Sequence, residues 1–185
     1  MKKNRFVFKS ILYFSYFFKI LPSFLISFIW SVSCPFEGAV SIFIRNIILF
    51  SKLKSFSGVI YVGRNVTIKN MDGISVGNNI SIHANCYLDG AGGIDIGDNV
   101  SIAHNSSILS FEHTANLLDL PIKYNPVIYN HTCICSDVWV GCGVRIIGGS
   151  YIHSRVIVAA GSVVRGILDE KSLYAGVPAK RVKSI

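Results

Sequence analysis

The sequence predicts a mainly β protein: a parallel β-helix of hexapeptide repeats, preceded by a helical, aromatic-rich segment and interrupted by a projecting loop. The first observation is an aliphatic residue at every sixth position of the C-terminal part. Amphipathic helices repeat at about 3.6 residues and half-buried strands at about 2, so neither produces this period. A chain that turns a corner every six residues and points one aliphatic side chain inward from each flat side does produce it. The run consists of Ile128, Ile134, Val140, Ile146, Ile152, Val158 and Val164.

The same spacing continues upstream, which is the second observation. Shorter hexad runs follow one another, and the extra residues at Asn70–Gly73 and Gly90–Gly93 fit at corners. Glycine often follows an inward position, where a corner needs positive φ or close backbone approach. A β-sandwich would instead alternate with a period of 2. We therefore expect the β-helix to span residues 55–185. The upstream inward positions are Val62, Ile68, Val76, Ile82, Leu88, Ile96, Ile102 and Ile108.

The third observation is the contrast of residues 1–54, which hold eight Lys and Arg residues against the single acid Glu37. Residues 6–32 are rich in Phe and Tyr, but Lys19 and Pro22 interrupt the apolar run. A spanning helix needs about 20 uninterrupted apolar residues. We expect helices that associate with a membrane surface through residues 1–32, aromatic side in the lipid and basic side chains at anionic headgroups. Packing on the β-helix or a neighbouring subunit, and a signal peptide or true span, are the alternatives.

Several other classes of protein are disfavoured by composition. The five cysteines are odd in number and lie near coil positions, which indicates buried fillers and not a disulfide framework. His131, Cys133 and Cys135 alternate along one strand, but their spacing matches no common zinc pattern. We expect no metal. A basic aromatic helix without a nucleic-acid-binding motif gives no reason to expect nucleic acid as a partner.

The hexad register stops after Ile108 and resumes at Ile128, so residues 110–127 leave the coil as a loop. The interior of a β-helix is filled by its stacked aliphatic side chains, so chemistry must take place on the outside. Loops that project from a rigid scaffold commonly carry function. His113 lies just inside this loop. We expect it to face a groove between subunits.

Four motifs occur in order along residues 58–185: Ile96–Ala103 followed by His113, Asp137–Gly141, Ala159–Val164 and Gly176–Lys180. On these residues the chain resembles the hexapeptide-repeat acyltransferases, in particular the maltose and galactoside O-acetyltransferases and the O-acetyltransferases of surface polysaccharides. The resemblance implies a left-handed β-helix, a homotrimer, and acetyl-CoA bound between adjacent β-helices.

The resemblance makes His113 the catalytic residue. An alcohol is a weak nucleophile at neutral pH, and histidine titrates near neutrality, so it suits the role of general base. His113 would take the proton of the acceptor hydroxyl and pass it to the leaving thiolate. Glu112, Asp89 and Asp119 are each candidates to orient the ring. Backbone N–H groups around Gly141–Cys142 are candidates for holding the oxyanion.

The remaining expected site residues bind the two substrates. Basic side chains suit the phosphates of CoA, and the tail after Pro178 resembles the CoA-binding tail of the family. The acceptor-binding candidates are Asn85, Asp89, Glu112 and Trp139, and the cofactor-binding candidates are Cys142, Ala160, Arg165, Gly166, Lys180, Arg181 and Lys183.

These expectations combine into one hypothesis. The chain transfers an acetyl group from acetyl-CoA to a sugar hydroxyl of a surface polysaccharide or its lipid-linked precursor, at the inner face of the cytoplasmic membrane. Two alternatives remain open: an N-acetyltransferase of a nucleotide-linked amino sugar, and a β-helical scaffold without catalysis.

Overall fold

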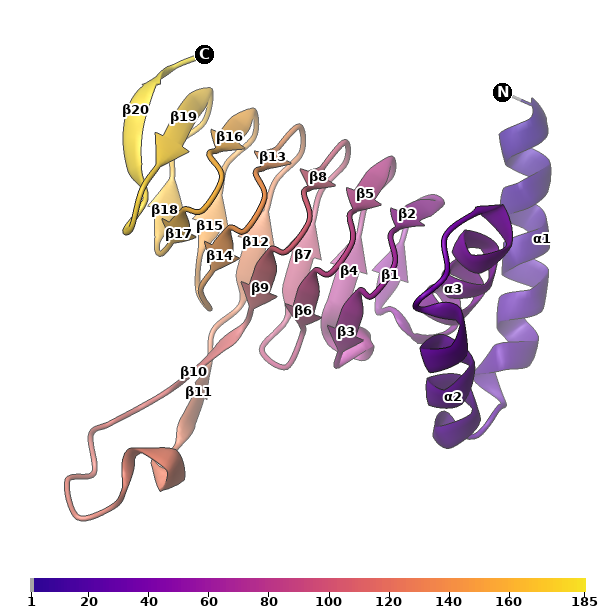
Figure 1. Ribbon diagram of the computed structural model, residues 1–185, viewed down its shortest axis with the longest axis horizontal. Helices are drawn as coiled ribbons and strands as arrows, with labels where there is room; N and C mark the ends of the chain where they lie inside the picture. Colours follow the sequence, from indigo (N-terminus) through magenta and orange to yellow (C-terminus); the bar gives the residue numbers. More distant parts are fainter. Residues whose placement is uncertain (1) are drawn as a thin grey trace.

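The computed structural model describes residues 2–185, with side chains from Phe8 onward. Three helices at the N-terminal end lead into a β-helix, and the chain ends at the opposite end of that β-helix (Figure 1). The helices are α1 (Lys2–Lys19), α2 (Ser23–Ser33) and α3 (Ala39–Lys52). The predicted combination of a β-helix and an N-terminal helical segment is therefore confirmed.

Three sheets form the walls of the β-helix, and each full coil adds one strand to each wall. The first wall holds β1 (Ser55–Phe56), β4 (Ile74–Val76), β7 (Ile94–Ile96), β12 (Thr132–Ile134), β15 (Tyr151–Ile152) and β18 (Ile167–Leu168). The second holds β2 (Ile60–Val62), β5 (Ile80–Ile82), β8 (Ser101–Ile102), β13 (Trp139–Val140), β16 (Val156–Val158), β19 (Ser172–Ala175) and the antiparallel β20 (Lys180–Ser184). The third holds β3 (Thr67–Lys69), β6 (Tyr87–Asp89), β9 (Ser107–Leu109), β14 (Arg145–Ile146) and β17 (Val163–Val164).

The hexad residues stack inside this prism. Ile134 pairs in register with Ile96 on one neighbouring coil and with Ile152 on the other, so like positions lie above one another. Parallel strands buried on one face by such a stack remove aliphatic surface from water along the whole axis. Six predicted positions, Ile134, Val140, Ile146, Ile152, Val158 and Val164, are at most 1% exposed.

The prediction for Ile128 is wrong. Its side chain is 44% exposed, and the residue lies in β11 (Val127–Tyr129), which pairs antiparallel with β10 (Phe111–His113). These two strands form a hairpin that projects from the prism (Figure 1). The coil resumes only at β12, so the six-residue spacing from Ile128 to Ile134 is coincidental. A short 3₁₀ helix, η2 (Ile122–Tyr124), lies near the hairpin tip, and another, η1 (Met71–Gly73), lies at a corner of the prism.

Two kinds of residue make the corners. Asn65, Asn85 and Asn105 all have positive φ and occupy equivalent places on successive coils. The N–H groups of Asn85 and Asn105 bond to the coil before, and that of Asn65 bonds to the Cys34 carbonyl just after α2. Asparagine adopts this left-handed conformation more readily than most residues. Gly141 serves differently, because a Cβ there would lie 2.6 Å from the backbone nitrogen of Ala160. A corner glycine can serve positive φ or close backbone approach, and at Gly141 the reason is close approach.

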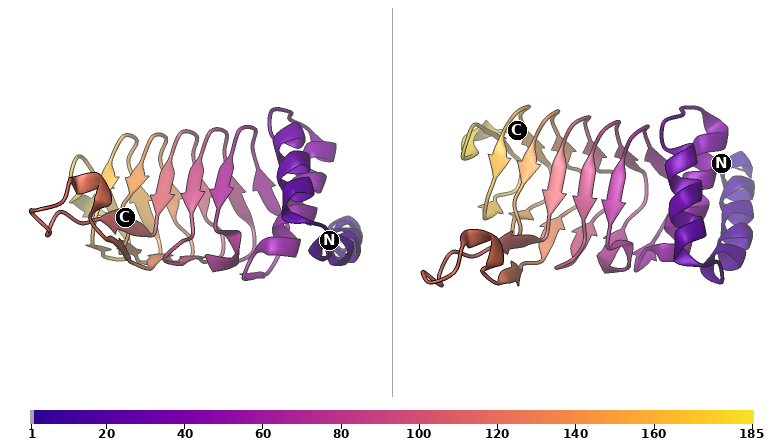
Figure 2. Two further views of the ribbon diagram at one scale, coloured as in Figure 1. Left: turned by 90° about the horizontal axis from the view of Figure 1, so that it is seen from below. Right: turned by 60° about the horizontal axis from the view of Figure 1, so that its bottom comes forward.

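Helix α3 closes the N-terminal end of the prism (Figure 2). The buried Asn46 side chain imitates a neighbouring strand: it accepts a hydrogen bond from the N–H of Ile60 at 2.8 Å and donates one to the Ile60 carbonyl at 2.7 Å. Phe50 stacks on Phe56 of the first strand, with ring centroids 3.9 Å apart. Thus α3, which follows the aromatic segment of residues 1–32, packs against the first coil.

Helices α1 and α2 are buried on one side only. Ile11 and Ile26 are covered, whereas a series of large apolar side chains is exposed to solvent. Within residues 2–185, no helix combines the length and the apolar character required to cross a bilayer. The exposed series on these helices and the segment that follows is Tyr13, Phe14, Tyr16, Phe17, Ile20, Phe24, Leu25, Phe28, Val32, Phe36 and Val40.

Candidate active site

The stem of the projecting hairpin is anchored to two neighbouring coils. The buried Ser110 hydroxyl donates to the Asp89 carbonyl at 2.6 Å and accepts from the Gly92 N–H at 2.8 Å. On the other side, Phe111 passes directly over Gly148, where a Cβ would lie 2.8 Å from the Phe111 nitrogen. The point at which the chain leaves the prism is therefore sharply defined.

His113 is the last residue of β10, opposite Val127, and its side chain is exposed. Within the described residues its ring has no hydrogen-bond partner. The next residue, Thr114, closes the stem through its N–H and hydroxyl, both bonded to the Pro126 carbonyl. The imidazole is thus presented to the outside by a short antiparallel ladder, two residues beyond the point where the stem contacts Gly148.

Glu112 does not orient the ring of His113 within this chain. Successive side chains on a strand point to opposite faces, so the two diverge. Glu112 instead forms an ion pair with Arg165, which follows β17 on the third wall. Two residues that were expected to contact different substrates are therefore partners of one another.

Asp89 lies on the third wall and is buried by its own chain. One carboxylate oxygen accepts from the Asn70 amide at 2.6 Å, and the other accepts from the Tyr87 hydroxyl at 3.1 Å. Burial, together with this hydrogen bond and the charge of Asp89, raises the pKa of Tyr87. The carboxylate is thus held in the wall beside the base of the hairpin, and no contact joins it to His113.

Asn85, Cys142 and Ala160 lie along one edge of the prism, between the second and third walls, with the coil of Asn105 between Asn85 and Cys142. Asn85 is exposed and belongs to the column of positive-φ corner residues. The N–H of Gly161, just after Ala160, bonds to the Cys142 carbonyl at 2.8 Å, which links these two corners of successive coils. The expected acceptor residue and the expected pantetheine contacts therefore lie along the same edge.

The C-terminal tail folds back over the last coils. The Ala179 N–H bonds to the Val163 carbonyl at 2.8 Å, and β20 then runs antiparallel to β19. Arg181 is occupied within the chain, because its guanidinium donates to the hydroxyls of Ser172 and Ser184. Lys180 and Lys183 are exposed and make no ion pair among the described residues, so they are the free cations of the tail.

Trp139 lies on a different wall from the hairpin. Its side chain is 55% exposed on the second wall, between Ser101 and Ile157 of the adjacent strands. It borders a hollow of about 290 Å³ that also touches Ile185 at the chain end. Within one chain, then, Trp139 and His113 are not brought together.

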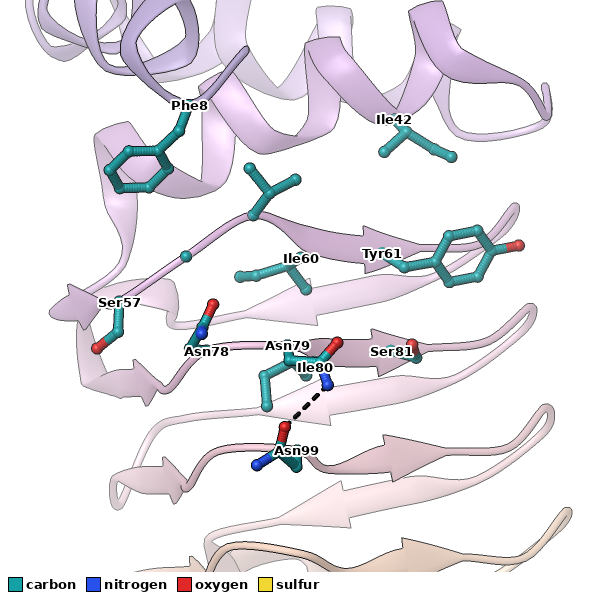
Figure 3. A pocket seen from close by; sticks show the side chains of 12 residues that line it. Phe8, Ile42, Ser57, Ile60, Tyr61, Asn78, Asn79, Ile80, Ser81 and Asn99 are labelled. Carbon is teal, nitrogen blue, oxygen red and sulfur yellow. Dashed lines mark hydrogen bonds between the residues drawn. The ribbon is translucent and has the colours of Figure 1, made fainter. Parts of the chain in front are cut away.

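A hollow of about 830 Å³ lies between the helices and the first coils. Figure 3 shows Phe8 and Ile42 on its helical side and a row of asparagines on its strand side. The Asn79 side chain donates to the Asn99 side chain at 2.8 Å, and both residues have positive φ at corners. This hollow contains none of the predicted site residues.

The suspected soft-metal residues lie on the first wall. His131 pairs with Asp95 at 3.1 Å, and Cys133 lies in register between Asp95 and Tyr151. Burial, with smaller contributions from Cys135 and Asp95, raises the pKa of the Cys133 thiol to about 11. Among the described residues, no group of three or more His, Cys, Asp or Glu side chains is arranged to hold a metal ion.

Three features of the site were not anticipated from the sequence. These are the anchoring role of Ser110, the contact of Phe111 with Gly148, and the order of the loop tip around Asn125. The buried Asn125 side chain accepts from the Leu117 N–H and donates to carbonyls of the same loop. The Gly148–Gly149 pair was the one available signal, since paired glycines indicate a close approach or a turn.

The geometry defines a class of protein: a hexapeptide-repeat β-helix with a histidine on a projecting hairpin. No family model matches the chain. It is 32% identical over 129 residues to a Mycobacterium tuberculosis protein named as an acetyltransferase, covering 70% of this chain and 36% of that one. It is 29% identical over 130 residues to an Escherichia coli protein named for lipopolysaccharide biosynthesis O-acetyl transfer, covering 69% of this chain and 59% of that one.

Solved structures agree with the sequence comparison. A maltose O-acetyltransferase from Clostridium difficile superposes with a TM-score of 0.76 at 25% identity, covering 87% of this chain and 84% of that one. A galactoside acetyltransferase in complex with coenzyme A superposes with a TM-score of 0.74 at 20% identity, covering 84% and 76%. In sequence and fold the chain is similar to hexapeptide-repeat acetyltransferases. It spans 36% and 59% of the lengths of the two curated relatives named above.

Proposed function

We propose that the chain is an acetyl-CoA-dependent O-acetyltransferase that modifies a sugar hydroxyl of a surface polysaccharide or its lipid-linked precursor. The observation that carries this proposal is the exposed imidazole of His113 on a stem anchored at Ser110 and Phe111. The interior of the prism is filled, so a substrate hydroxyl can reach a base only on the outside of the prism. The names of the two curated relatives support acetyl transfer, and one of them supports a glycan acceptor.

In this mechanism His113 acts as general base. It accepts the proton of the sugar hydroxyl while the oxygen attacks the thioester carbonyl. The C–O bond forms, the C–S bond then breaks, and the proton passes from the imidazolium to the departing thiolate. Proton transfer by a positioned side chain typically contributes about 10²–10⁴-fold to the rate. Backbone N–H groups near Gly141–Cys142 remain our candidates for the oxyanion.

The residues present fit coenzyme A as the acyl carrier. Lys180 and Lys183 are exposed cations without an ion-pair partner in the described chain, and phosphate oxygens are suitable partners for them. The edge that contains Cys142 and Ala160 supplies backbone groups for an extended, uncharged arm. Gly166, with φ of 82°, lies at the next corner, between the third and first walls, where a Cβ would meet nothing within 4 Å. Arg181 contributes by holding β20 in place, since its donors are bonded to Ser172 and Ser184.

We further propose that the active unit is a homotrimer. His113 and Trp139 lie on different walls of one prism, and the His113 ring has no partner within the described chain. A groove between two prisms brings the hairpin of one subunit opposite the wall of the next. Asn85, Asp89 and Trp139 remain acceptor-site candidates in that arrangement.

The exposed series on α1 and α2 supports attachment to a membrane surface. An aromatic face beside basic side chains such as Lys9 and Lys19 is the composition of an interfacial helix. The cytoplasmic leaflet is anionic, so this surface would hold the enzyme where lipid-linked glycans are available. We therefore place the protein at the inner face of the cytoplasmic membrane.

Acetyl-CoA turnover against a panel of acceptors tests the activity. The panel holds free sugars, membrane-extracted lipid-linked glycans and nucleotide-linked amino sugars. We expect turnover with the glycans and a loss of about 10²–10⁴-fold in kcat for His113→Ala. His153→Ala is the matched control, because His153 lies at a corner between the first and second walls, on a different edge from Cys142 and Ala160. Turnover confined to amino sugars would replace the O-acetyl proposal with N-acetylation, and no turnover or CoA binding would favour a scaffold.

Vesicle sedimentation tests the membrane proposal separately. Wild type should bind vesicles that contain about 30% phosphatidylglycerol more tightly than neutral phosphatidylcholine vesicles, because charge and apolar burial act together. Tyr13→Ser with Phe17→Ser should weaken binding to both. Tyr129→Ser is the control, since this exposed aromatic lies on the hairpin. Unchanged binding of the double variant would contradict the proposal.

A further inference from the structure

We infer that the ion pair between Glu112 and Arg165 positions the catalytic histidine, so that Arg165 serves the hairpin and not the phosphates of the cofactor. This inference rests on the proposed function, because it assigns a role to residues around His113 as the base. Glu112 precedes His113 on β10, and Arg165 follows β17 on the third wall. The pair therefore joins the projecting hairpin to a coil near the end of the chain.

The position of the pair along the stem is what gives it this role. Ser110 anchors the exit of the stem to Asp89 and Gly92, and Phe111 lies against Gly148. Glu112 is the next residue, and its contact with Arg165 is the last described contact with the prism before His113. Beyond this point the next hydrogen bonds in the described part of the chain lie within the stem, between Thr114 and Pro126. The three successive contacts reach three different coils, so they hold the stem against tilting as well as against sliding.

The alternation of the strand links the pair to the imidazole. Glu112 and His113 point to opposite faces of the ladder. Holding the Glu112 carboxylate against the third wall therefore determines which way the His113 ring faces. If the pair is broken, the stem is free to rotate about the contact at Phe111, and His113 moves with it.

The exposure of the two side chains indicates that the pair contributes little to the stability of the whole fold. The side chains are 65% exposed for Arg165 and 24% exposed for Glu112. Exposed ion pairs contribute little to the stability of the whole fold, because water screens them. A displacement of about 1 Å at a reacting group, by contrast, can lower a rate by about 10²-fold. The pair should therefore affect kcat far more than the unfolding temperature.

The neighbourhood also argues against Arg165 as a phosphate ligand. A phosphate that approached this guanidinium would meet the carboxylate of Glu112, and two anions on one cation repel each other. Lys180 and Lys183 carry no such neighbour among the described ion pairs. The two roles for Arg165 lead to different kinetics: a phosphate ligand acts on the KM for acetyl-CoA, and a positioning residue acts on kcat.

The test compares Glu112→Gln, Arg165→Met and the charge-reversed double variant Glu112→Arg with Arg165→Glu. Each single variant should lose about 10–100-fold in kcat, with the KM for acetyl-CoA within about 3-fold of wild type. The double variant should recover most of the lost kcat, because the attraction is restored with the charges exchanged. Unfolding temperatures should stay within about 2 °C of wild type. Glu37→Gln is the control, since it breaks the exposed pair with Arg64 near the helical segment.

Other outcomes would overturn the inference. A raised KM in Arg165→Met with kcat unchanged, and no effect of Glu112→Gln, would return Arg165 to the cofactor. Single variants with wild-type kcat would overturn the inference alone, provided that His113→Ala is inactive in the same assay. Wild-type turnover by His113→Ala would overturn both this inference and the mechanism on which it rests.

Discussion

The backbone of Phe111 passes so close to Gly148 that no side chain fits between them. A Cβ at residue 148 would lie 2.8 Å from the Phe111 nitrogen and 3.2 Å from its carbonyl oxygen. Both atoms belong to backbone, so rotation of a side chain cannot relieve the overlap. The absence of a side chain at Gly148 is thus a condition for the path that the hairpin takes on its way to His113.

Gly148→Ala should therefore lower activity by moving the stem. We expect a loss of at least about 10-fold in kcat, because the stem must shift by several tenths of an ångström or more to admit the methyl group. Steady-state kinetics on the folded protein measure this. Gly77→Ala is the control: its Cβ would lie 2.7 Å from the Gly97 carbonyl carbon, at a corner between the first and second walls. Gly77→Ala should destabilise the fold yet leave the kcat of the folded fraction unchanged, and equal kcat losses would contradict the prediction.

Asn125 should order the tip of the hairpin. Its buried side chain is bonded to Leu117, Leu120 and Pro121 in a segment that is otherwise exposed, with Leu118 93% exposed. Asn125→Ala removes these bonds, and a typical intramolecular hydrogen bond contributes about 0.5–1.5 kcal/mol. Amide exchange in residues 115–124 should become faster, while the strands of the prism keep their protection. Asn116→Ala, at an exposed position of the same loop, should leave the exchange pattern unchanged.

Arg45 should be one of the residues most sensitive to substitution for stability. It is fully buried on α3 and donates to the carbonyls of Ser33, Phe36 and Gly63, which ties the end of α2 to the first coil. Burial lowers the pKa of its guanidinium, and electrostatic interactions with Cys34, Tyr61 and Glu37 act in the opposite direction. Arg45→Met leaves at least three carbonyls without this donor, so we expect a loss of about 3 kcal/mol or more in the free energy of unfolding.

Denaturant titration measures that loss, which corresponds to a fall of about 6–12 °C in unfolding temperature for a chain of this size. Arg64→Met is the matched control, because Arg64 is exposed and forms an exposed ion pair with Glu37. If both variants had the same stability, the network around Arg45 would contribute nothing measurable.

Cys133 should react slowly with alkylating agents. Its thiol pKa is raised from 9.0 to about 11. At pH 8 the thiolate fraction is then about 10²-fold smaller than for an ordinary thiol, and the greater nucleophilicity of a more basic thiolate offsets about 10-fold of this. The alkylation rate of Cys133 should keep rising about tenfold per pH unit to about pH 10. Mass spectrometry of the Cys133 peptide measures this rate. A rate that levels off near pH 9 would contradict the raised pKa.

The raised pKa of Cys133 also makes the stability of the fold depend on pH. The folded protein holds the thiol proton more tightly than the unfolded chain does. The neutral thiol therefore contributes stability that is fully present below about pH 9 and is lost as the pH rises toward 11. Cys133→Ser should flatten the alkaline limb of the unfolding curve across that range.

The walls of the prism could be predicted because their cause is local and repeated. Each of Ile134, Val140 and Ile146 meets the same environment on its own coil, so the pattern is visible at every sixth position. Ile128 has the same spacing and residue type but lies in the hairpin. Spacing alone could not distinguish them, because whether the chain stays in the coil depends on the antiparallel pairing of β10 with β11.

The site was predictable only in part. His113 was identified from its place in the loop and from a resemblance, and the structure presents its ring to the outside. The partners of Glu112, Asp89 and Arg181 were not foreseen, since each bonds to residues on another strand or coil. Each of these contacts depends on how the coils stack and on where a loop leaves them.

The sequence by itself determined the β-helix, its aliphatic interior and the break that carries His113, because these follow from a periodic alternation of burial along one chain. Only the tertiary structure decided where the coil resumes, which charges are paired and which cations stay free. The physical reason is that stacking sets residues far apart in the sequence at hydrogen-bonding distance, as with Glu112 and Arg165. A six-residue period contains no information about such pairs.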